Sequence, residues 1–207
     1  MGKPTLTYFD MPASRGEECR LAFHLAGIDF VDRRIRMSDW PALRPNTPFG
    51  AMPFVEWPGH PPLGQSNAIL TLIGRQGGLH PKDDFEAARH EAMMCHMEAL
   101  RDQIGSTLRM DEAEKKRVRA TIVESYLPAW GANGERQCGG GPFFGGASLS
   151  VVDLKIHVVI RWLASGKLDH IPASSIADFK KLNAIREAVR NHPGVKSWDA
   201  KNAARAT

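Results

Sequence analysis

Residues 49–66 constrain the fold of this chain more than any other stretch; they read Phe-Gly-Ala-Met-Pro-Phe-Val-Glu-Trp-Pro-Gly-His-Pro-Pro-Leu-Gly-Gln-Ser. The pattern predicts a loop, a short apolar strand from Pro53 to Trp57, a turn rich in proline and glycine, a second short strand, and a helix that starts at Ser66. Proline is tolerated at the first position of a strand because it lacks only one ladder donor there. We therefore expect a β-hairpin that leads directly into a helix.

The same stretch has the parts of a site for a small peptide. If the Met52–Pro53 bond is cis, the backbone N–H and C=O of Met52 turn outward, and an extended peptide can pair with them as one more strand. Ser66 opens the helix pattern Ser-Asn-Ala-Ile-Leu-Thr-Leu-Ile, and the N-terminus of a helix favours a bound carboxylate. Met52-Pro53 followed by Gln65-Ser66 therefore indicates a site for a small peptide with a free carboxylate.

The residues before this stretch predict two more strands and two helices. Leu6 to Phe9 and Phe30 to Ile35 have strand patterns, and Gly16 to Ala26 is an amphipathic helix ended by Gly27. Ser38-Asp39-Trp40-Pro41 starts a short irregular helix. The resulting order, β-α-β-α-β-β-α, predicts a mixed sheet with helices on its faces, which is the thioredoxin-like arrangement.

No strand pattern recurs after the linker at residues 77–83, Gly-Gly-Leu-His-Pro-Lys-Asp. We therefore predict an N-terminal α/β, thioredoxin-like domain at residues 1–76 and an all-α C-terminal domain at 84–207. Ser150-Val-Val-Asp153 is a capping box that opens an unusually apolar helix, expected to be the buried centre of the second domain. The expected helices are 85–110, 112–130 (ended by Gly131), 151–164 and 174–191, followed by a turn or two at 195–204 after Pro193-Gly194.

Composition argues against several classes of function. The 27 basic and 23 acidic residues give a net charge of +4, which can attract an anionic small molecule but is too weak to indicate nucleic-acid binding. No window approaches the length of a membrane span, and the N-terminus has no apolar signal region. Three widely spaced cysteines fit reduced thiols in a cytoplasm, where we expect the protein to be located.

Tyr8, at the end of the first strand, is the leading candidate for chemistry. In a thioredoxin fold this position faces the groove opposite Met52, where the hydroxyl can donate to a substrate sulfur. Lowering a thiol pKa from about 8.5 to about 7 requires about 2 kcal/mol. One hydrogen bond to a charged group supplies about 1.5–3 kcal/mol, so a single donor is sufficient. The alternative, a ring packed at a strand end with its hydroxyl in water, stays open.

Other reactive patterns are weaker. The strand before the first helix is not followed by Cys-x-x-Cys, and Cys19 falls on the apolar pattern of that helix, which favours packing. His90 and His96 are not spaced to share one helix face around a metal, so we predict no metal site. Ser150, Asp153 and His157 suggest a triad, but the serine and aspartate already have a structural role as a cap.

These patterns together resemble the tyrosine-type cytosolic glutathione transferases (sigma, pi, mu and alpha classes) over essentially the whole chain. The motifs that carry the resemblance are Thr7-Tyr8-Phe9, Arg15 with Glu17 and Arg20, Trp40, Phe49-Gly50, Met52-Pro53, Gln65 to Leu70, and the Ser150–Asp153 cap.

The resemblance implies roles for individual residues, with glutathione as co-substrate and no cofactor. Tyr8 activates the glutathione sulfur, and Arg15 lies near the thiolate as a second catalytic residue. The implied glutathione contacts are Tyr8 at the sulfur, Trp40 and Arg44 at the glycine carboxylate, the Met52 backbone next to Pro53 at the cysteinyl unit, and Gln65 and Ser66 at the γ-glutamyl carboxylate. The implied electrophile pocket comprises Met11, Pro12, Ile104 and Leu108.

The chain departs from the family pattern at two positions. Ala51 cannot make the polar contact to the glycine end that a side chain after Phe49-Gly50 often makes. Ala99 occupies the position where many members carry an aspartate that reaches the partner subunit's glutathione, although Glu98 is adjacent.

The sequence therefore predicts an enzyme that adds the glutathione thiolate to small hydrophobic electrophiles. A glutathione-dependent isomerase, for example of a prostaglandin-like endoperoxide, is an alternative. A carrier of apolar ligands or a crystallin-like structural protein on the same fold is another. The resemblance also implies a homodimer, in which Phe49 enters a groove of the partner near the Met93 and Met97 face.

Overall fold

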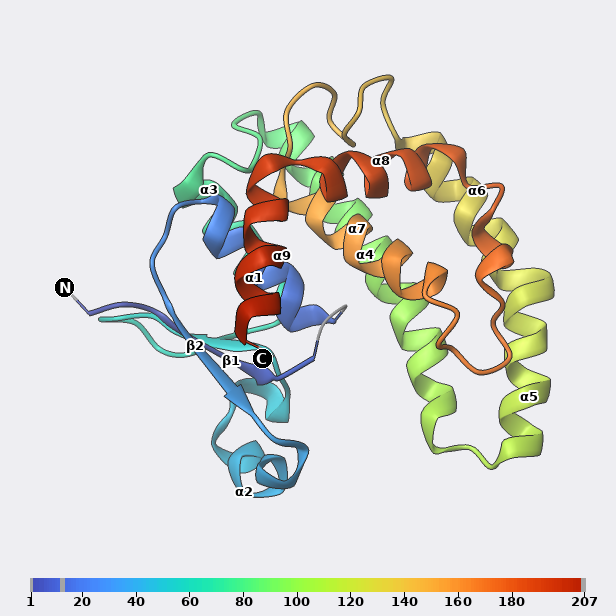
Figure 1. Cartoon of the computed structure of the whole chain (residues 1–207), viewed down its shortest axis with the longest axis horizontal. Helices are drawn as coiled ribbons and strands as arrows, with labels where there is room; N and C mark the ends of the chain where they lie inside the picture. Colours follow the sequence, from blue (N-terminus) through green and yellow to red (C-terminus); the bar gives the residue numbers. More distant parts are fainter. Residues whose placement is uncertain (1, 12–13, 206–207) are drawn as a thin grey trace.

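A computed structural model of the chain describes residues 2–11 and 14–205. A small sheet with its covering helices forms the N-terminal part, and a group of longer helices forms the rest (Figure 1). The expected combination of a thioredoxin-like α/β unit and an all-α unit is confirmed.

The sheet has four strands in the order β2-β1-β3-β4. Strand β1 (Thr5–Phe9) pairs in parallel with β2 (Val31–Ile35) and antiparallel with β3 (Phe54–Glu56), which pairs antiparallel with β4 (Leu63–Gly64). The parallel pair requires a crossover, and helix α1 (Arg15–Leu25) supplies it. Strand β1 is an inner strand, with β2 on one side and β3 on the other. Its C-terminal end, where Tyr8 lies, is therefore central in the sheet and not at its border.

Helices α1 and α3 (Ser66–Gly77) both begin at the cavity described below, at Arg15 and Ser66. Helix α1 packs against α3 and against the helical part of the molecule. The short α2 (Trp40–Leu43) follows β2, with Pro41 in its first turn, and 3-10 turns at Arg44–Asn46 and Pro48–Gly50 continue the chain to β3.

The helical part is organised around one buried helix. Helix α7 (Val151–Ala164) contacts α1, α4 (Asp84–Ser106) and α8 (Lys180–Asn191), and every residue from Val151 to Ile160 is buried. Figure 1 shows α7 between α4 and α8, with α9 (Pro193–Arg205) running back along α1. The expectation of a buried central helix is confirmed, as is the capping box that opens it.

Some predicted helix boundaries were wrong. The helix expected to end at Gly131 is α5 (Glu112–Thr121), which continues through a π-helical turn (Ile122–Tyr126) into α6 (Leu127–Gln137). A Cβ on Gly131 would lie 2.2 Å from the Phe179 ring, so this glycine allows close packing and does not end the helix.

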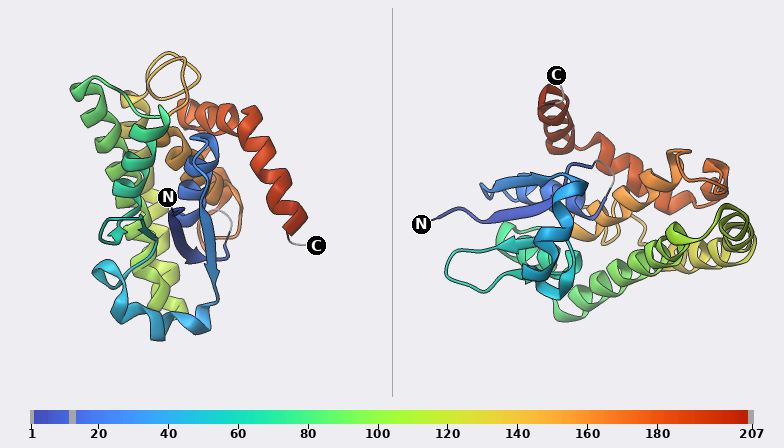
Figure 2. Two further views of the ribbon diagram at one scale, coloured as in Figure 1. Left: turned by 90° about the vertical axis from the view of Figure 1, so that its left-hand side faces the viewer. Right: turned by 90° about the horizontal axis from the view of Figure 1, so that it is seen from below.

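The end of the chain also differs from the sequence expectation. A 3-10 turn (Ala173–Ile176) precedes α8, which begins only at Lys180. Pro193 starts α9, because the first position of a helix needs no N–H donor. The two views in Figure 2 show this last helix standing apart from α8 at a steep angle. Within the part that the structure describes, no helix is long and apolar enough to cross a membrane.

Candidate functional site

A cavity of about 240 Å³ lies where the N-terminal and helical parts meet. The start of α1, the loop before β3, the start of α3 and the middle of α4 each contribute to its wall. Its lining residues are Arg15, Ala51, Met52, Pro53, Gln65, Ser66, Glu98 and Asp102. The structure thus brings together five residues expected at a peptide site, and the Met52–Pro53 peptide bond between two of them is cis.

The N-terminus of α3 forms one wall of the cavity. Gln65 has a left-handed backbone (φ 69°), its carbonyl accepts the first hydrogen bond of the helix from Ile69, and Ser66 is the first helical residue. The unpaired N–H groups of a first helical turn carry partial positive charge. This geometry suits a bound carboxylate.

Tyr8 lies at the end of β1 with its ring packed on the backbone of α1. A Cβ placed on Gly16 would lie 2.3 Å from the Cδ1 atom of Tyr8, so only glycine allows this ring position. Burial raises the pKa of the Tyr8 hydroxyl above its ordinary value of 10, although the charge of Arg15 and a hydrogen bond with Ser14 oppose the shift. The phenol therefore remains protonated at neutral pH and can act as a hydrogen-bond donor.

Arg15 is held by two carboxylates of α4. Its Nε atom donates to Glu98 at 2.7 Å, and its second guanidinium nitrogen lies 3.2 Å from Asp102. Burial alone would raise the pKa of Glu98, but the charges of Lys155, Arg101 and Arg15 outweigh it and lower the pKa to about 2. Glu98 is therefore ionised at all physiological pH values.

The residues expected at the glycine end of the peptide do not line this cavity. The Trp40 ring packs edge-on against Phe9 with ring centroids 6.1 Å apart. The Nε atom of Arg44 donates to the Gly50 carbonyl at 3.2 Å, close to the Met52 loop. Both side chains stand on the 3-10 and helical turns that lead to this loop, outside the cavity wall.

The residues of the expected electrophile pocket differ in their exposure to solvent. Met11 is 45% exposed and Leu108 is 68% exposed, so both have free apolar surface. Ile104 is 1% exposed and belongs to the hydrophobic core, and its assignment to that pocket stays a prediction. Pro12 lies outside the described residues.

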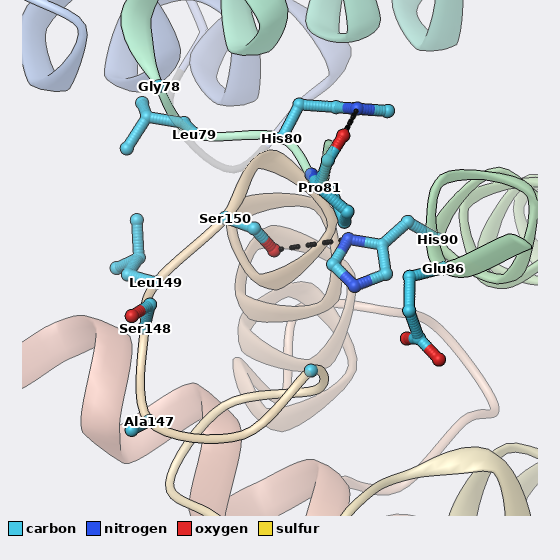
Figure 3. A pocket seen from close by; sticks show the side chains of 11 residues that line it. Gly78, Leu79, His80, Pro81, Glu86, His90, Ala147, Ser148, Leu149 and Ser150 are labelled. Carbon is cyan, nitrogen blue, oxygen red and sulfur yellow. Dashed lines mark hydrogen bonds between the residues drawn. The ribbon is translucent and has the colours of Figure 1, made fainter. Parts of the chain in front are cut away.

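A second cavity, of about 250 Å³, lies beside Ser150, the residue of the suggested catalytic triad that lines it (Figure 3). The Ser150 hydroxyl donates to the Asp153 carboxylate at 2.8 Å, and its oxygen is 3.4 Å from Nδ1 of His90. His157 instead contacts the Arg186 carbonyl at 2.9 Å. The structure therefore supports the capping role of Ser150 and Asp153 and provides no triad through His157.

The comparisons with known proteins agree with this geometry. A sequence profile described as "Glutathione S-transferase, C-terminal domain" matches residues 98–202. Glutathione S-transferase 1 of Ascaris suum is 33% identical, and the match covers 94% of each chain. The chain belongs to the cytosolic glutathione transferase family. By family it is an enzyme, a glutathione S-transferase.

Two other similarities widen the range of functions within the family. The structure of prostaglandin synthase D of Nilaparvata lugens superposes on this transferase with a TM-score of 0.85 and 25% identity, covering 97% of this chain and 98% of the other. S-crystallin 4 of Enteroctopus dofleini is 26% identical over 94% of each chain.

Sequence reasoning did not assign several residues in and beneath this cavity to the candidate site. Glu98 and Asp102 are spaced i, i+4 on α4, which places both on one face, and this spacing was a usable signal. Lys155 is a charged residue within an otherwise apolar helix, and a buried charge requires partners. The sequence could not show that those partners are Glu18, Glu98 and Ser66, because they come from three other helices.

Proposed function

We propose that this transferase adds the glutathione thiolate to small hydrophobic electrophiles and that the Tyr8 hydroxyl activates the thiol. The observation that carries the proposal is the Tyr8 phenol at the end of β1, a neutral donor close to Arg15, because Arg15 lines the cavity formed by the Met52 loop and the N-terminus of α3. A neutral donor at this position stabilises the thiolate over the thiol. Arg15, a fixed positive charge nearby, favours the same form.

The magnitude is adequate for the task. One hydrogen bond to a charged acceptor contributes about 1.5–3 kcal/mol, and each pKa unit corresponds to 1.36 kcal/mol. A single bond from Tyr8 therefore lowers the thiol pKa by about one to two units. A thiol with an ordinary pKa of about 8.5 would then be largely ionised near neutral pH.

The rest of glutathione is assigned from the cavity walls. Gln65, Ser66 and the α3 N-terminus hold the γ-glutamyl carboxylate, and the Met52 backbone next to Pro53 pairs with the cysteinyl unit. Trp40 and Arg44 are assigned to the glycine carboxylate. This last assignment requires Arg44 to leave the Gly50 carbonyl and reorient on binding.

The electrophile is assigned to Met11, Pro12, Ile104 and Leu108. Met11 and Leu108 are exposed and apolar, which suits a small hydrophobic molecule. The proposal includes two domains, at residues 1–76 and 84–207. It also includes a cytoplasmic location, which the three free cysteines fit.

A glutathione-dependent isomerase is the second candidate. It is favoured by the structural similarity to an insect prostaglandin synthase, because an isomerase can use the same activated thiolate on an endoperoxide. The similarity to an S-crystallin favours a non-catalytic role. The Tyr8 environment argues for catalysis, since a lens or carrier role requires no buried donor beside a peptide site.

We also propose a symmetric homodimer joined through Phe49. This ring is 79% exposed although it is large and apolar, and its backbone is left-handed (φ 59°). A cavity of about 260 Å³ lies between α4 and α6, with Ala92, Met93 and His96 in its wall. An aromatic ring that enters such a pocket is a usual anchor of an interface.

The test begins with retention of the protein on immobilised glutathione. It continues with a thiol-addition assay that uses a chromogenic aryl halide, and then a panel of electrophiles and an endoperoxide. We expect retention and measurable addition. Retention with isomerisation but no addition would favour the second candidate. The absence of both binding and turnover would refute the proposed enzyme and favour the structural role.

A further inference from the structure

Lys155 is a fully buried lysine whose ammonium group reaches the edge of the glutathione site. Its Nζ atom lies 2.7 Å from Glu18, 2.6 Å from Glu98 and 3.1 Å from the Ser66 hydroxyl oxygen. An ammonium group has three N–H donors and no acceptor, and here three acceptors surround it. Because α1, α3 and α4 each provide one acceptor to a lysine of α7, its position is fixed from three directions.

This arrangement determines how the Ser66 hydroxyl is oriented. Since Lys155 can only donate, the oxygen of Ser66 must accept, and the hydroxyl hydrogen points away from the ammonium. Within residues 2–11 and 14–205, the Ser66 hydroxyl donates to no protein acceptor. Ser66 lines the cavity, so its hydrogen is available to a ligand there.

The charges around Lys155 balance. The connected groups comprise three cations and three anions, which gives a net charge of zero: Arg15, Arg101 and Lys155 against Glu18, Glu98 and Asp102. Glu18 and Arg101 are buried and do not line the cavity, whereas Glu98 and Asp102 do. The cluster therefore places no net formal charge in the core beneath the site.

We propose that Lys155 is a positioning residue that makes the site selective for thiol peptides bearing an α-carboxylate on the γ-glutamyl unit. It fixes Ser66 as an acceptor on the protein side, so that the serine hydroxyl donates to that carboxylate. The inference rests on the proposed function, because it takes Gln65 and Ser66 as the place where the γ-glutamyl end binds.

The experiment compares two thiol peptides in the addition assay: glutathione, and its analogue in which 4-aminobutanoate replaces the γ-glutamyl unit and so lacks only the α-carboxylate. For Lys155→Met we expect the KM for glutathione to rise about tenfold, and the KM for the analogue to change less than twofold. The bound-thiol pKa should stay unchanged, since Tyr8 is untouched. Ser66→Ala should have a similar effect, and adding Lys155→Met to it should raise the KM little further.

Glu18→Gln is the matched control, because it removes a partner of Lys155 and leaves the Ser66 contact in place. It should keep the preference for glutathione over the analogue. If Lys155→Met does not fold, the double variant Glu18→Gln/Lys155→Met, which removes one charge of each sign, takes its place.

The outcomes separate the two proposals. Equal increases in KM for both peptides, no increase, or full additivity with Ser66→Ala would overturn the role of Lys155. Wild-type protein that adds neither peptide to the aryl halide would instead refute the proposed transferase activity itself.

Discussion

Replacing Phe49 by alanine should dissociate the proposed dimer. The ring is 79% exposed in one chain, and an aromatic side chain buries about 150–250 Å² when it is covered. At about 25 cal/mol per Å², covering about 160 Å² of this ring contributes about 4 kcal/mol. A symmetric dimer contains two such contacts, and because these contributions are not additive we take 4 kcal/mol as the lower bound.

This bound corresponds to a dimer weakened about 700-fold or more, since each 1.4 kcal/mol is a factor of ten in the dissociation constant. The assay is sedimentation equilibrium or light scattering across nanomolar to micromolar concentrations. Phe85→Ala is the matched control, because Phe85 is 75% exposed and lies on α4, where no pocket has been assigned to it. Ala92→Trp, at an exposed position in the wall of the proposed receiving pocket, should weaken the dimer as Phe49→Ala does.

Two results would refute the reasoning in different ways. A monomeric mass for the wild-type protein at micromolar concentration would remove the dimer altogether. A stable dimer whose dissociation constant is unchanged by Phe49→Ala, or is weakened equally by Phe85→Ala, would leave the dimer and refute the role of Phe49.

Three further predictions follow from contacts near the site and in the core. Gly16→Ala places a methyl group 2.3 Å from the Tyr8 ring, so we expect a loss of about 1–3 kcal/mol in urea unfolding and a fall in kcat; unchanged values would mean that the ring position is not constrained. Asp153→Ala removes three hydrogen bonds, two from Ser150 and one from the Phe144 amide. We expect the free energy of unfolding in urea to fall by about 3–5 kcal/mol, and a fall below about 1 kcal/mol would contradict the role of the buried cap. The charges of Lys155, Arg101 and Arg15 lower the pKa of Glu98 on folding from its ordinary 4.5, so this group stabilises the fold above pH 4.5 and loses that contribution as the pH falls toward 2. Urea unfolding free energies that do not decrease between pH 4.5 and 3 would contradict this prediction.

The fold was largely readable from local patterns, because the hairpin, the capping box and the apolar α7 are local features. The signals that failed were those whose meaning depends on distant partners. Gly131 looks like a helix stop in the sequence, and only its approach to Phe179 reveals a packing role. Pro193 looks like a break, yet it opens α9.

The candidate site was predictable in its backbone parts and less so in its charges. Met52, Pro53, Gln65 and Ser66 come from one continuous stretch, and the structure brings them to one cavity. The acidic wall and the buried lysine come from helices far apart in the sequence, so no local pattern could pair them. Ile104 is buried in the core, because a periodic apolar helix face indicates burial as readily as it indicates a pocket, and its assignment to the electrophile pocket stays a prediction.

The central claim is that Tyr8 activates the glutathione thiol, and the pH dependence of Tyr8→Phe tests it most directly. This variant keeps the ring and removes only the donor, so glutathione affinity should change little while the pKa of the bound thiol, followed by its ultraviolet absorbance, rises by about one to two units. The rate of addition at pH 6.5 should fall about tenfold or more, and the deficit should shrink as the pH rises and the thiol ionises unaided. Superimposable pH–rate profiles for the two proteins would contradict the account and would make Tyr8 a packing residue at the end of β1.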